Sequence, residues 1–254
     1  MKNYKVVLAY DGGRYNGWQK QGNTENTIQE RLERILTEIC GSAIEVHGSG
    51  RTDAGTHATG QVMHFHAAWQ KTPQDLLDAL NERLPEDIAG LSIEEMPPRF
   101  HSRLSATGKH YSYTIWTSRR PPVFRRKYVF RCERALDIAA MRQAAAAFVG
   151  EHDFRSFCAN KRMKKSTVRN IFRIDFEQSE DSLTLHFYGN GFLYQMIRIL
   201  TGTLIEVGEG KRAPQEMRGI LLEKNRECAG FTAPSRGLCL CEIFYDNEEG
   251  GQGR

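Results

Sequence analysis

Several features are scarce or missing in this 254-residue sequence. No run of 18 apolar residues occurs, so we expect no helix that spans a membrane. The first five residues lead straight into a strand-like segment and lack the apolar core of a signal peptide. Six cysteines are present, but Cys239 and Cys241 have one residue between them, whereas common zinc sites have two to four. We therefore expect reduced thiols in a cytoplasmic protein.

Acidic residues are missing from two segments of the chain. Residues 99–131 hold nine Lys and Arg, residues 154–174 hold seven, and neither segment has an Asp or Glu. The net charge of the whole chain is only +4, so the remaining residues are acidic on balance. Confined positive charge is typical of a surface that binds a polyanion, because each neutralised phosphate releases counterions. The alternative is two basic loops that are merely solvated.

Hydrophobic periodicity predicts a mixed α+β fold, with strands where apolar residues alternate and helices where they recur at helical spacing. Thr27 and Glu30 fit a capping box at the start of the first helix, and Gly41 is placed to end it with positive φ. In chain order we expect strand 4–10, helix 27–39, strands 44–47 and 61–66, helix 72–84, strand 91–94, strands 110–116 and 127–132, helix 137–150, strands 169–178 and 183–188, helix 192–207, a short helix near Pro214 and strand 238–245.

The first six of these elements have the order β-α-β-β-α-β, which returns with additions later in the chain. This order predicts two ferredoxin-like halves with mainly antiparallel sheets. We expect one half at residues 1–104 and the other at 105–247, the latter with RNA-binding insertions, followed by a flexible tail at 248–254. Two such sheets side by side leave a central cleft, which is a common place for a binding site.

A glycine-rich loop is expected at residues 48–60, between two strands. It contains four glycines, and glycine permits positive φ and the close approach of another backbone or a ligand. The loop has neither the Gly-Lys-Ser/Thr of a Walker loop nor the third glycine of a dinucleotide fingerprint. Arg51 stands two residues before Asp53, and a nearby cation keeps a carboxylate ionised. Asp53 is then either a nucleophile or base, or an Asp that shapes a turn.

Histidines near this loop suggest a competing hypothesis. His64 and His66 lie two apart on an expected strand, so they share one face. Together with His57 and Asp53 they could hold a metal ion, although His-x-His on a strand is weak evidence for a metal site.

Aromatic and basic residues in the second half also fit RNA. Tyr111 and Tyr113 share one face of an expected strand in the first acid-free segment, where aromatic rings suit stacking on bases, although aromatics are also ordinary strand formers. Arg198 lies between Ile197 and Ile199 in an apolar helix, so we expect a carboxylate or phosphate partner for it. The alternative is a side chain that reaches solvent from the edge of the helix.

The run Gly50-Arg51-Thr52-Asp53-Ala54-Gly55-Thr56-His57, with Gly60-Gln61-Val62, resembles the signature of the tRNA pseudouridine synthase A family. Further matches occur in order along nearly the whole chain, and no position among them departs from the family pattern. They are Tyr10-Asp11-Gly12, Gly17-Trp18-Gln19, Thr27-Ile28-Gln29-Glu30, Phe100-His101-Ser102-Arg103, Ser105-Ala106, Tyr111-Ser112-Tyr113, Asp153-Phe154, Ser156-Phe157, Gly191-Phe192-Leu193, Met196-Ile197-Arg198 and Gly237-Leu238-Cys239-Leu240.

The resemblance implies an isomerase that converts uridine to pseudouridine at positions 38, 39 and 40 in the anticodon stem-loop of tRNA. It implies that Asp53 is the catalytic aspartate and that Tyr111 stacks on the target base. It implies that Arg198 pairs with the catalytic carboxylate and that Arg51 helps to hold the flipped nucleotide out. It also implies a homodimer bridged by tRNA, with no metal and no organic cofactor.

Two other functions compete with this one. A non-catalytic RNA-binding protein of tandem ferredoxin-like domains explains the basic segments and the aromatics, but not the glycine-rich loop with Arg51 and Asp53. A metal-dependent hydrolase would use Asp53, His57, His64 and His66.

Overall fold

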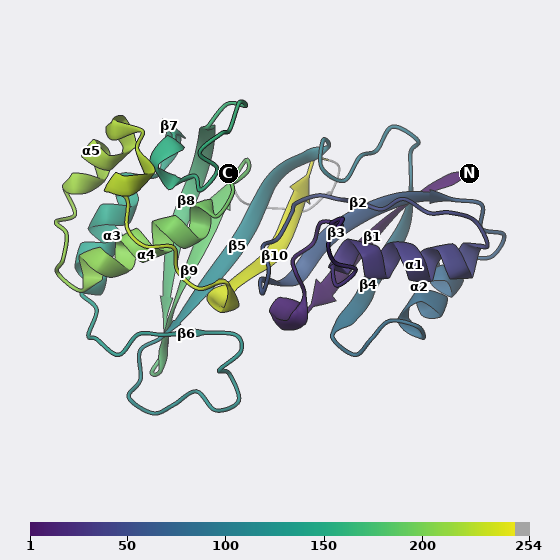
Figure 1. The fold of residues 1–254 in the computed structure, drawn as a ribbon, viewed down its shortest axis with the longest axis horizontal. Helices are drawn as coiled ribbons and strands as arrows, with labels where there is room; N and C mark the ends of the chain where they lie inside the picture. Colours follow the sequence, from purple (N-terminus) through teal and green to yellow (C-terminus); the bar gives the residue numbers. More distant parts are fainter. Residues whose placement is uncertain (247–254) are drawn as a thin grey trace. The chain divides into compact units, whose positions relative to one another are not determined.

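The computed structural model describes residues 1–246, which fold into two compact units (Figure 1). The first unit comprises Met1–Thr107 together with the segment that begins at Cys239, and the second comprises Gly108–Leu238. We expected the last strand in the second half of the chain, whereas the structure places it, from Cys239 onward, in the first unit. The tail expected at 248–254 lies outside the described residues. Within residues 1–246, no helix has the length and apolar character needed to cross a membrane.

The sheet of the first unit has the strand order β4-β1-β3-β10. β1 (Lys2–Tyr10) lies between β3 (His57–Ala67) and β4 (Ile88–Met96) and is antiparallel to both. β10 (Leu238–Tyr245) runs parallel to β3, where Cys239 pairs with His57. The two-residue strand β2 (His47–Gly48) pairs with β3 in the antiparallel sense. The order β-α-β-β-α-β expected for this part of the chain is therefore observed.

Both helices of the first unit begin where their capping residues predict. α1 (Ile28–Cys40) starts at Thr27, whose side chain accepts a hydrogen bond from the Glu30 N–H group, and it ends at Gly41 with φ of 66°. α2 (Pro73–Asn81) starts at Thr72 with a complete capping box and with proline at its first position. In Figure 1 both helices cover the same face of the sheet. Their apolar stripes and the sheet form the core, with Leu8, Leu32, Leu36, Phe65 and Leu80 fully or almost fully buried.

The sheet of the second unit has the strand order β5-β9-β8-β7, and the two-residue strand β6 (Phe130–Arg131) pairs with β5. The strands β5 (Ala106–Trp116), β9 (Ser182–Gly189), β8 (Val168–Gln178) and β7 (Gly150–Asp153) are each antiparallel to the next in this order, whereas β6 is parallel to β5. α3 (Ile138–Ala146) is capped by the Asp137 side chain and packs against α4 (Met196–Gly208). α5 (Glu216–Glu223) completes the helices described in this unit.

Several element boundaries differ from the sequence predictions, and three of the differences have a structural cause that periodicity does not report. β3 begins at His57 rather than 61, because its first residues pair with β10. α4 begins at Met196 rather than 192, because Gln195 adopts a left-handed backbone with φ of 58°. The strand expected at 127–132 shrinks to β6, because a turn closes where the Tyr128 N–H group donates to the Arg125 carbonyl.

Candidate active site

Asp53 lies half-buried in the loop between β2 and β3. The loop makes a tight turn at this point, because the Thr56 N–H group donates to the Asp53 carbonyl (3.1 Å) and Gly55 has φ of 75°. The turn involves the backbone of Asp53.

The segment from Tyr10 to Trp18 holds this loop from one side. The Trp18 N–H group donates to the Thr52 carbonyl (3.0 Å), and the Gly55 N–H group donates to the Tyr15 carbonyl (3.3 Å). Gly17 lies against the loop with φ of 90°, and a Cβ atom there would come within 2.7 Å of the Thr52 carbonyl oxygen. Only glycine suits such a backbone and such a close approach. Asp53 is thus placed by main-chain contacts to its immediate neighbours.

The same segment ties the loop to the start of α1. The N–H groups of Ile28 and Gln29, which have no partner inside the helix, donate to the carbonyls of Gly17 (3.2 Å) and Trp18 (3.0 Å). Trp18 is almost fully buried, and its ring lies against Gly48 so closely that a Cβ atom there would be 2.4 Å away. The first turn of α1 and the loop therefore share one packed support.

Gln61 supports the loop from the side of β3. Its side chain is fully buried, and its amide nitrogen donates to the Gly50 carbonyl (2.7 Å) and to the Tyr10 hydroxyl (3.4 Å). The Tyr10 hydroxyl also lies 2.9 Å from the Thr52 hydroxyl. Burial raises the pKa of Tyr10, opposed by its hydrogen bonds with Thr52 and Gln61, so the phenol stays neutral. A buried network of this kind rigidifies the loop because its members satisfy one another.

Sequence reasoning assigned no role to Tyr10, Gly17 or Gln61. The available signal was Gln61, an amide that shares a strand face with Met63 and Phe65. A buried amide needs partners, and the nearest chain segment lacking regular structure is the loop it holds. Arg51, which we expected beside the carboxylate, is exposed on the same loop.

Tyr111 and Arg198 lie in the second unit, so they are described apart from Asp53 and Arg51. Tyr111, on β5, is 7% exposed and meets the ring of Phe192 edge to face, with centroids 5.4 Å apart. Arg198, on α4, is half-buried, and its Nε atom donates to the Ala233 carbonyl (2.7 Å). We expected a carboxylate or phosphate partner for this cation, and one partner that it has is instead a backbone carbonyl.

Tyr113 answers the question left open for the two tyrosines. Its ring is fully buried and its hydroxyl donates to the Pro234 carbonyl (2.8 Å). Burial raises its pKa, while the positive charges of Arg198 and Arg236 oppose the rise. Tyr113 is thus a core residue near Arg198, whereas Tyr111 on the same strand face retains a small exposed area.

The histidines do not assemble with Asp53. His57 Nδ1 lies 3.1 Å from Asp11 Oδ1 and 3.2 Å from Gly12 N. His64 is buried between His47 and His101, with ring centroids 4.9 and 4.5 Å away, and His66 is exposed. Within residues 1–246, no group of three or more His, Cys, Asp or Glu is placed to hold a metal ion. The donor set of the hydrolase hypothesis is therefore not formed.

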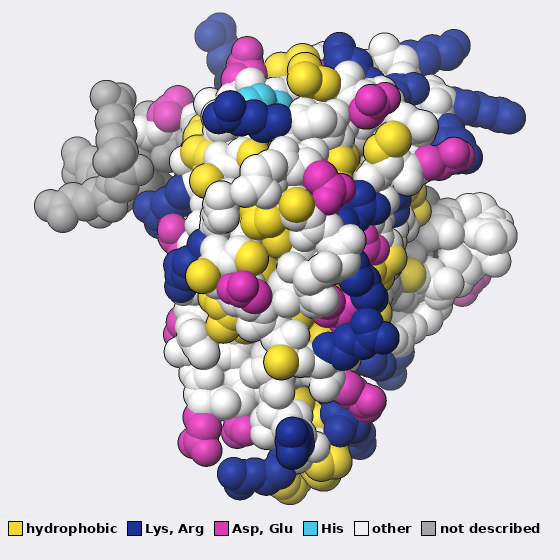
Figure 2. Space-filling model, turned by 90° about the vertical axis from the view of Figure 1, so that its left-hand side faces the viewer, with side chains coloured by type: hydrophobic (Ala, Val, Ile, Leu, Met, Phe, Trp, Pro, Cys, Tyr) yellow, Lys and Arg dark blue, Asp and Glu magenta, His cyan; other side chains and the backbone are white. Residues whose placement is uncertain are grey.

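Cationic side chains of the two acid-free segments are exposed on the second unit. In the first segment, Arg125 and Arg126 are exposed. Phe124, which directly precedes them and follows Val123, is 93% exposed. In the second, the exposed cations are Lys161, Arg162, Lys164, Lys165 and Arg173. Figure 2 shows Lys and Arg side chains gathered at the top and along the right-hand side of the face that it presents. Exposed cations around an exposed aromatic ring fit a surface that binds RNA.

Comparison with known proteins identifies the family. The family model described as tRNA pseudouridine synthase matches residues 6–104 and 144–246. The protein named tRNA pseudouridine synthase A in Bacillus sp. (strain KSM-64) is 45% identical to this chain, and the one in Clostridium kluyveri is 43% identical. Each alignment covers 96% of this chain and 100% of the relative. The protein of that name in Bacillus subtilis is 42% identical over 96% of this chain and 99% of its own length. The chain therefore belongs to the tRNA pseudouridine synthase family.

Proposed function

We propose that this protein isomerises uridine to pseudouridine in tRNA, at positions 38, 39 and 40 of the anticodon stem-loop, with Asp53 as its catalytic residue. The observation that carries this proposal is a half-buried carboxylate held by main-chain contacts on a glycine-rich loop, in a chain of this family. Fixed placement of a reactive group is what catalysis by positioning requires.

The reaction needs a nucleophile or base but no redox partner. The bond between uracil N1 and ribose C1′ breaks, a bond between C5 and C1′ forms, and the proton lost from C5 is balanced by one gained at N1. Substrate and product are isomers, so no metal or organic cofactor is part of the proposal. The target atoms are inaccessible in a stacked stem, so the nucleotide must be flipped out. Asp53 then adds to C6, attacks C1′ or takes a ribose proton, three routes that share an ionised carboxylate.

Three further residues are proposed to bind the substrate. Tyr111 stacks on the target base through the small part of its ring that reaches the surface. Arg51, exposed beside Asp53, contacts the flipped nucleotide. Arg198 supplies a half-buried cation whose backbone hydrogen bond holds its orientation.

The proposal has two structural parts as well. Each unit is taken to be a ferredoxin-like half. The first is supported by the order β1-α1-β2-β3-α2-β4, and the second by the order β5-β6-α3-β7-β8-β9-α4, in which β6 and β7 are additions to the pattern. The protein is taken to be a cytoplasmic homodimer, as the family likeness implies, with tRNA as its partner.

The decisive experiment compares Asp53→Asn with wild type on unmodified tRNA. The substitution keeps the size of the side chain and removes its charge, so we expect pseudouridine formation to vanish while tRNA binding persists. Asp78→Asn is the matched control, because it makes the same chemical change on the exposed surface of α2. Turnover retained in Asp53→Asn would contradict the assignment, and binding without turnover in wild type would favour a non-catalytic RNA-binding protein.

A further inference from the structure

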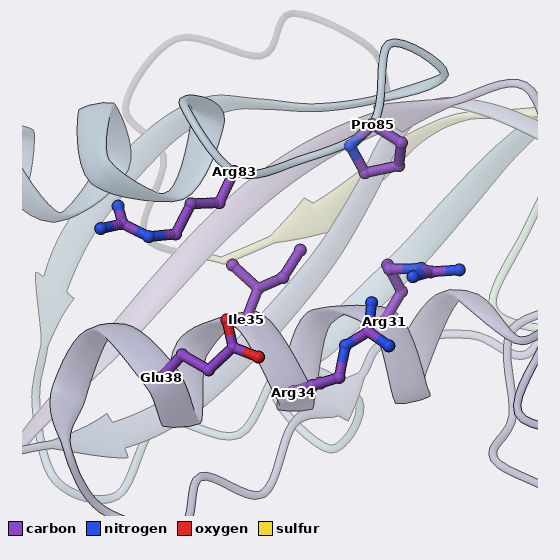
Figure 3. Close-up of a pocket in the computed structure, with 6 residues that line it drawn as sticks. All are labelled: Arg31, Arg34, Ile35, Glu38, Arg83 and Pro85. Atoms are coloured by element: carbon purple, nitrogen blue, oxygen red, sulfur yellow. The ribbon is translucent and has the colours of Figure 1, made fainter.

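A groove in the first unit lies between α1 and the turn that follows α2 (Figure 3). Its volume is about 450 Å³, and its lining residues are Arg31, Arg34, Ile35 and Glu38 of α1 with Arg83 and Pro85 opposite. Three arginines and one glutamate thus line the groove, and Figure 3 shows the Arg83 guanidinium directed away from Arg31 and Arg34. None of these residues belongs to the loop that carries Asp53 or to the acid-free segments.

The arginines of α1 are not neutralised by the acids of their own helix. Glu30 and Glu38 each stand four residues from Arg34, a spacing that favours ion pairs on a helix. Glu30 instead contacts Lys20 at 3.0 Å, and Glu33 contacts the same lysine at 3.4 Å. Within residues 1–246, no carboxylate oxygen lies within 4.0 Å of the guanidinium of Arg31 or Arg34. In Figure 3 both side chains rise from α1 toward the turn that carries Pro85.

Like charges one helical turn apart on a helix repel each other, so an anion placed between half-buried Arg31 and exposed Arg34 would relieve that repulsion. Guanidinium groups match the geometry of phosphate oxygens, because their N–H donors form a planar fork. Ile35 at the base of the groove is 4% exposed, and its apolar surface lowers the local screening of these charges. On the opposite wall, Arg83 Nη1 donates to the Ala79 carbonyl (3.0 Å) and lies 3.9 Å from Glu82 Oε2, so its charge is already compensated in part.

We propose that this groove is a phosphate-binding site, with Arg31 and Arg34 as its principal donors. The phosphate is either a backbone phosphate of bound tRNA, an extension that rests on the proposed function, or free inorganic phosphate. Glu38 opposes binding, because it is the one carboxylate that lines the groove. Its neutralisation should therefore strengthen binding, an effect that misfolding cannot produce.

The experiment has two arms that use the full-length protein. Inorganic phosphate is titrated in a calorimeter, and tRNA affinity is measured against salt concentration. Wild type is compared with Arg31→Ala/Arg34→Ala, with Glu38→Gln, and with Lys71→Ala, an exposed cation of the same unit outside the groove. The double variant should lose phosphate binding, and Glu38→Gln should bind phosphate more tightly.

The double variant should bind tRNA about tenfold more weakly near 0.1 M salt. The steepness of log K against log salt concentration should decrease by about 1 to 2, since each lost phosphate contact reduces that slope by about one. Replacement of Arg125, Arg126 and Lys127 by Ala should flatten the slope independently and serves as the positive control. Lys71→Ala should change neither quantity.

Loss of phosphate binding with an unchanged tRNA slope identifies free phosphate as the ligand and supports the site. Unchanged behaviour of the double variant in both arms overturns the proposal. Turnover by Asp53→Asn would refute the proposed function yet leave the phosphate arm intact, so the two failures are distinguishable.

Discussion

Gly17→Ala should damage catalysis far more than it damages folding. The backbone of Gly17 has φ of 90°, and an alanine in such a conformation costs about 1–2 kcal/mol of folding free energy. The new Cβ atom would lie 2.7 Å from the Thr52 carbonyl oxygen, whereas ordinary contact begins at 3.4 Å, so the loop must recede by about 0.7 Å. Asp53 follows Thr52 directly. A shift approaching 1 Å in a reacting group costs up to about 100-fold in rate, so we expect kcat to fall between about 10- and 100-fold.

The assay is release of tritium from tRNA labelled at uracil C5, because isomerisation through C5 expels that hydrogen. It is run at saturating tRNA beside urea unfolding. Two glycines separate strain from displacement. Gly41→Ala introduces the same kind of backbone strain, with φ of 66°, but its new Cβ atom has no neighbour within 4 Å. Gly22→Ala introduces neither backbone strain nor a close contact. Gly41→Ala should lose about 1–2 kcal/mol with normal kcat. If Gly17→Ala loses stability but keeps wild-type kcat, the idea that this glycine places Asp53 is wrong.

Two further predictions concern stability. Burial, aided by neighbouring imidazoles, lowers the pKa of His64 from 6.5 to about 4, so the unfolded chain takes up this proton first. The free energy of unfolding therefore keeps its full value above pH 6.5 and decreases as the pH falls toward 4. At pH 5 the decrease is about 2 kcal/mol. His64→Gln should remove that loss in urea unfolding at pH 7.5 and 5, and an unchanged pH dependence would contradict it. Gly202→Ala should cost about 3 kcal/mol, because its Cβ would lie 1.9 Å from the Phe231 carbonyl oxygen. Gly219→Ala, in α5 with no atom within 4 Å, should instead stabilise by about 0.5–1 kcal/mol, and equal effects of the two substitutions would contradict the steric argument.

Local signals predicted the elements whose causes are local. Thr27, Thr72 and Asp137 cap helices in the structure as their positions suggest, because a side-chain oxygen can satisfy the nearby N–H groups of a helix start. The errors arose where a distant segment decides. The extension of β3 to His57 depends on Cys239, some 180 residues further along the chain, and no periodicity in either segment records that pairing.

The site divides in the same way. Asp53 was found through a run of residues that is continuous in the sequence. Tyr10 and Gln61, which hold its loop, are separated by fifty positions and meet only after β1 and β3 pair. Sequence reasoning can name a reactive carboxylate, but it does not reveal which buried polar groups keep that carboxylate in place.

The contacts around Asp53 explain how its loop is held in place. The groups that hold it from the side of Trp18 and Tyr15 are backbone amides and carbonyls, so their geometry does not depend on the side chains of residues 51–55. The same support receives the first N–H groups of α1, so a change at Gly17 or Trp18 alters the helix start and the loop together. For this reason, substitutions in the segment from Tyr10 to Trp18 should behave as active-site substitutions, although none of its side chains needs to touch the uracil.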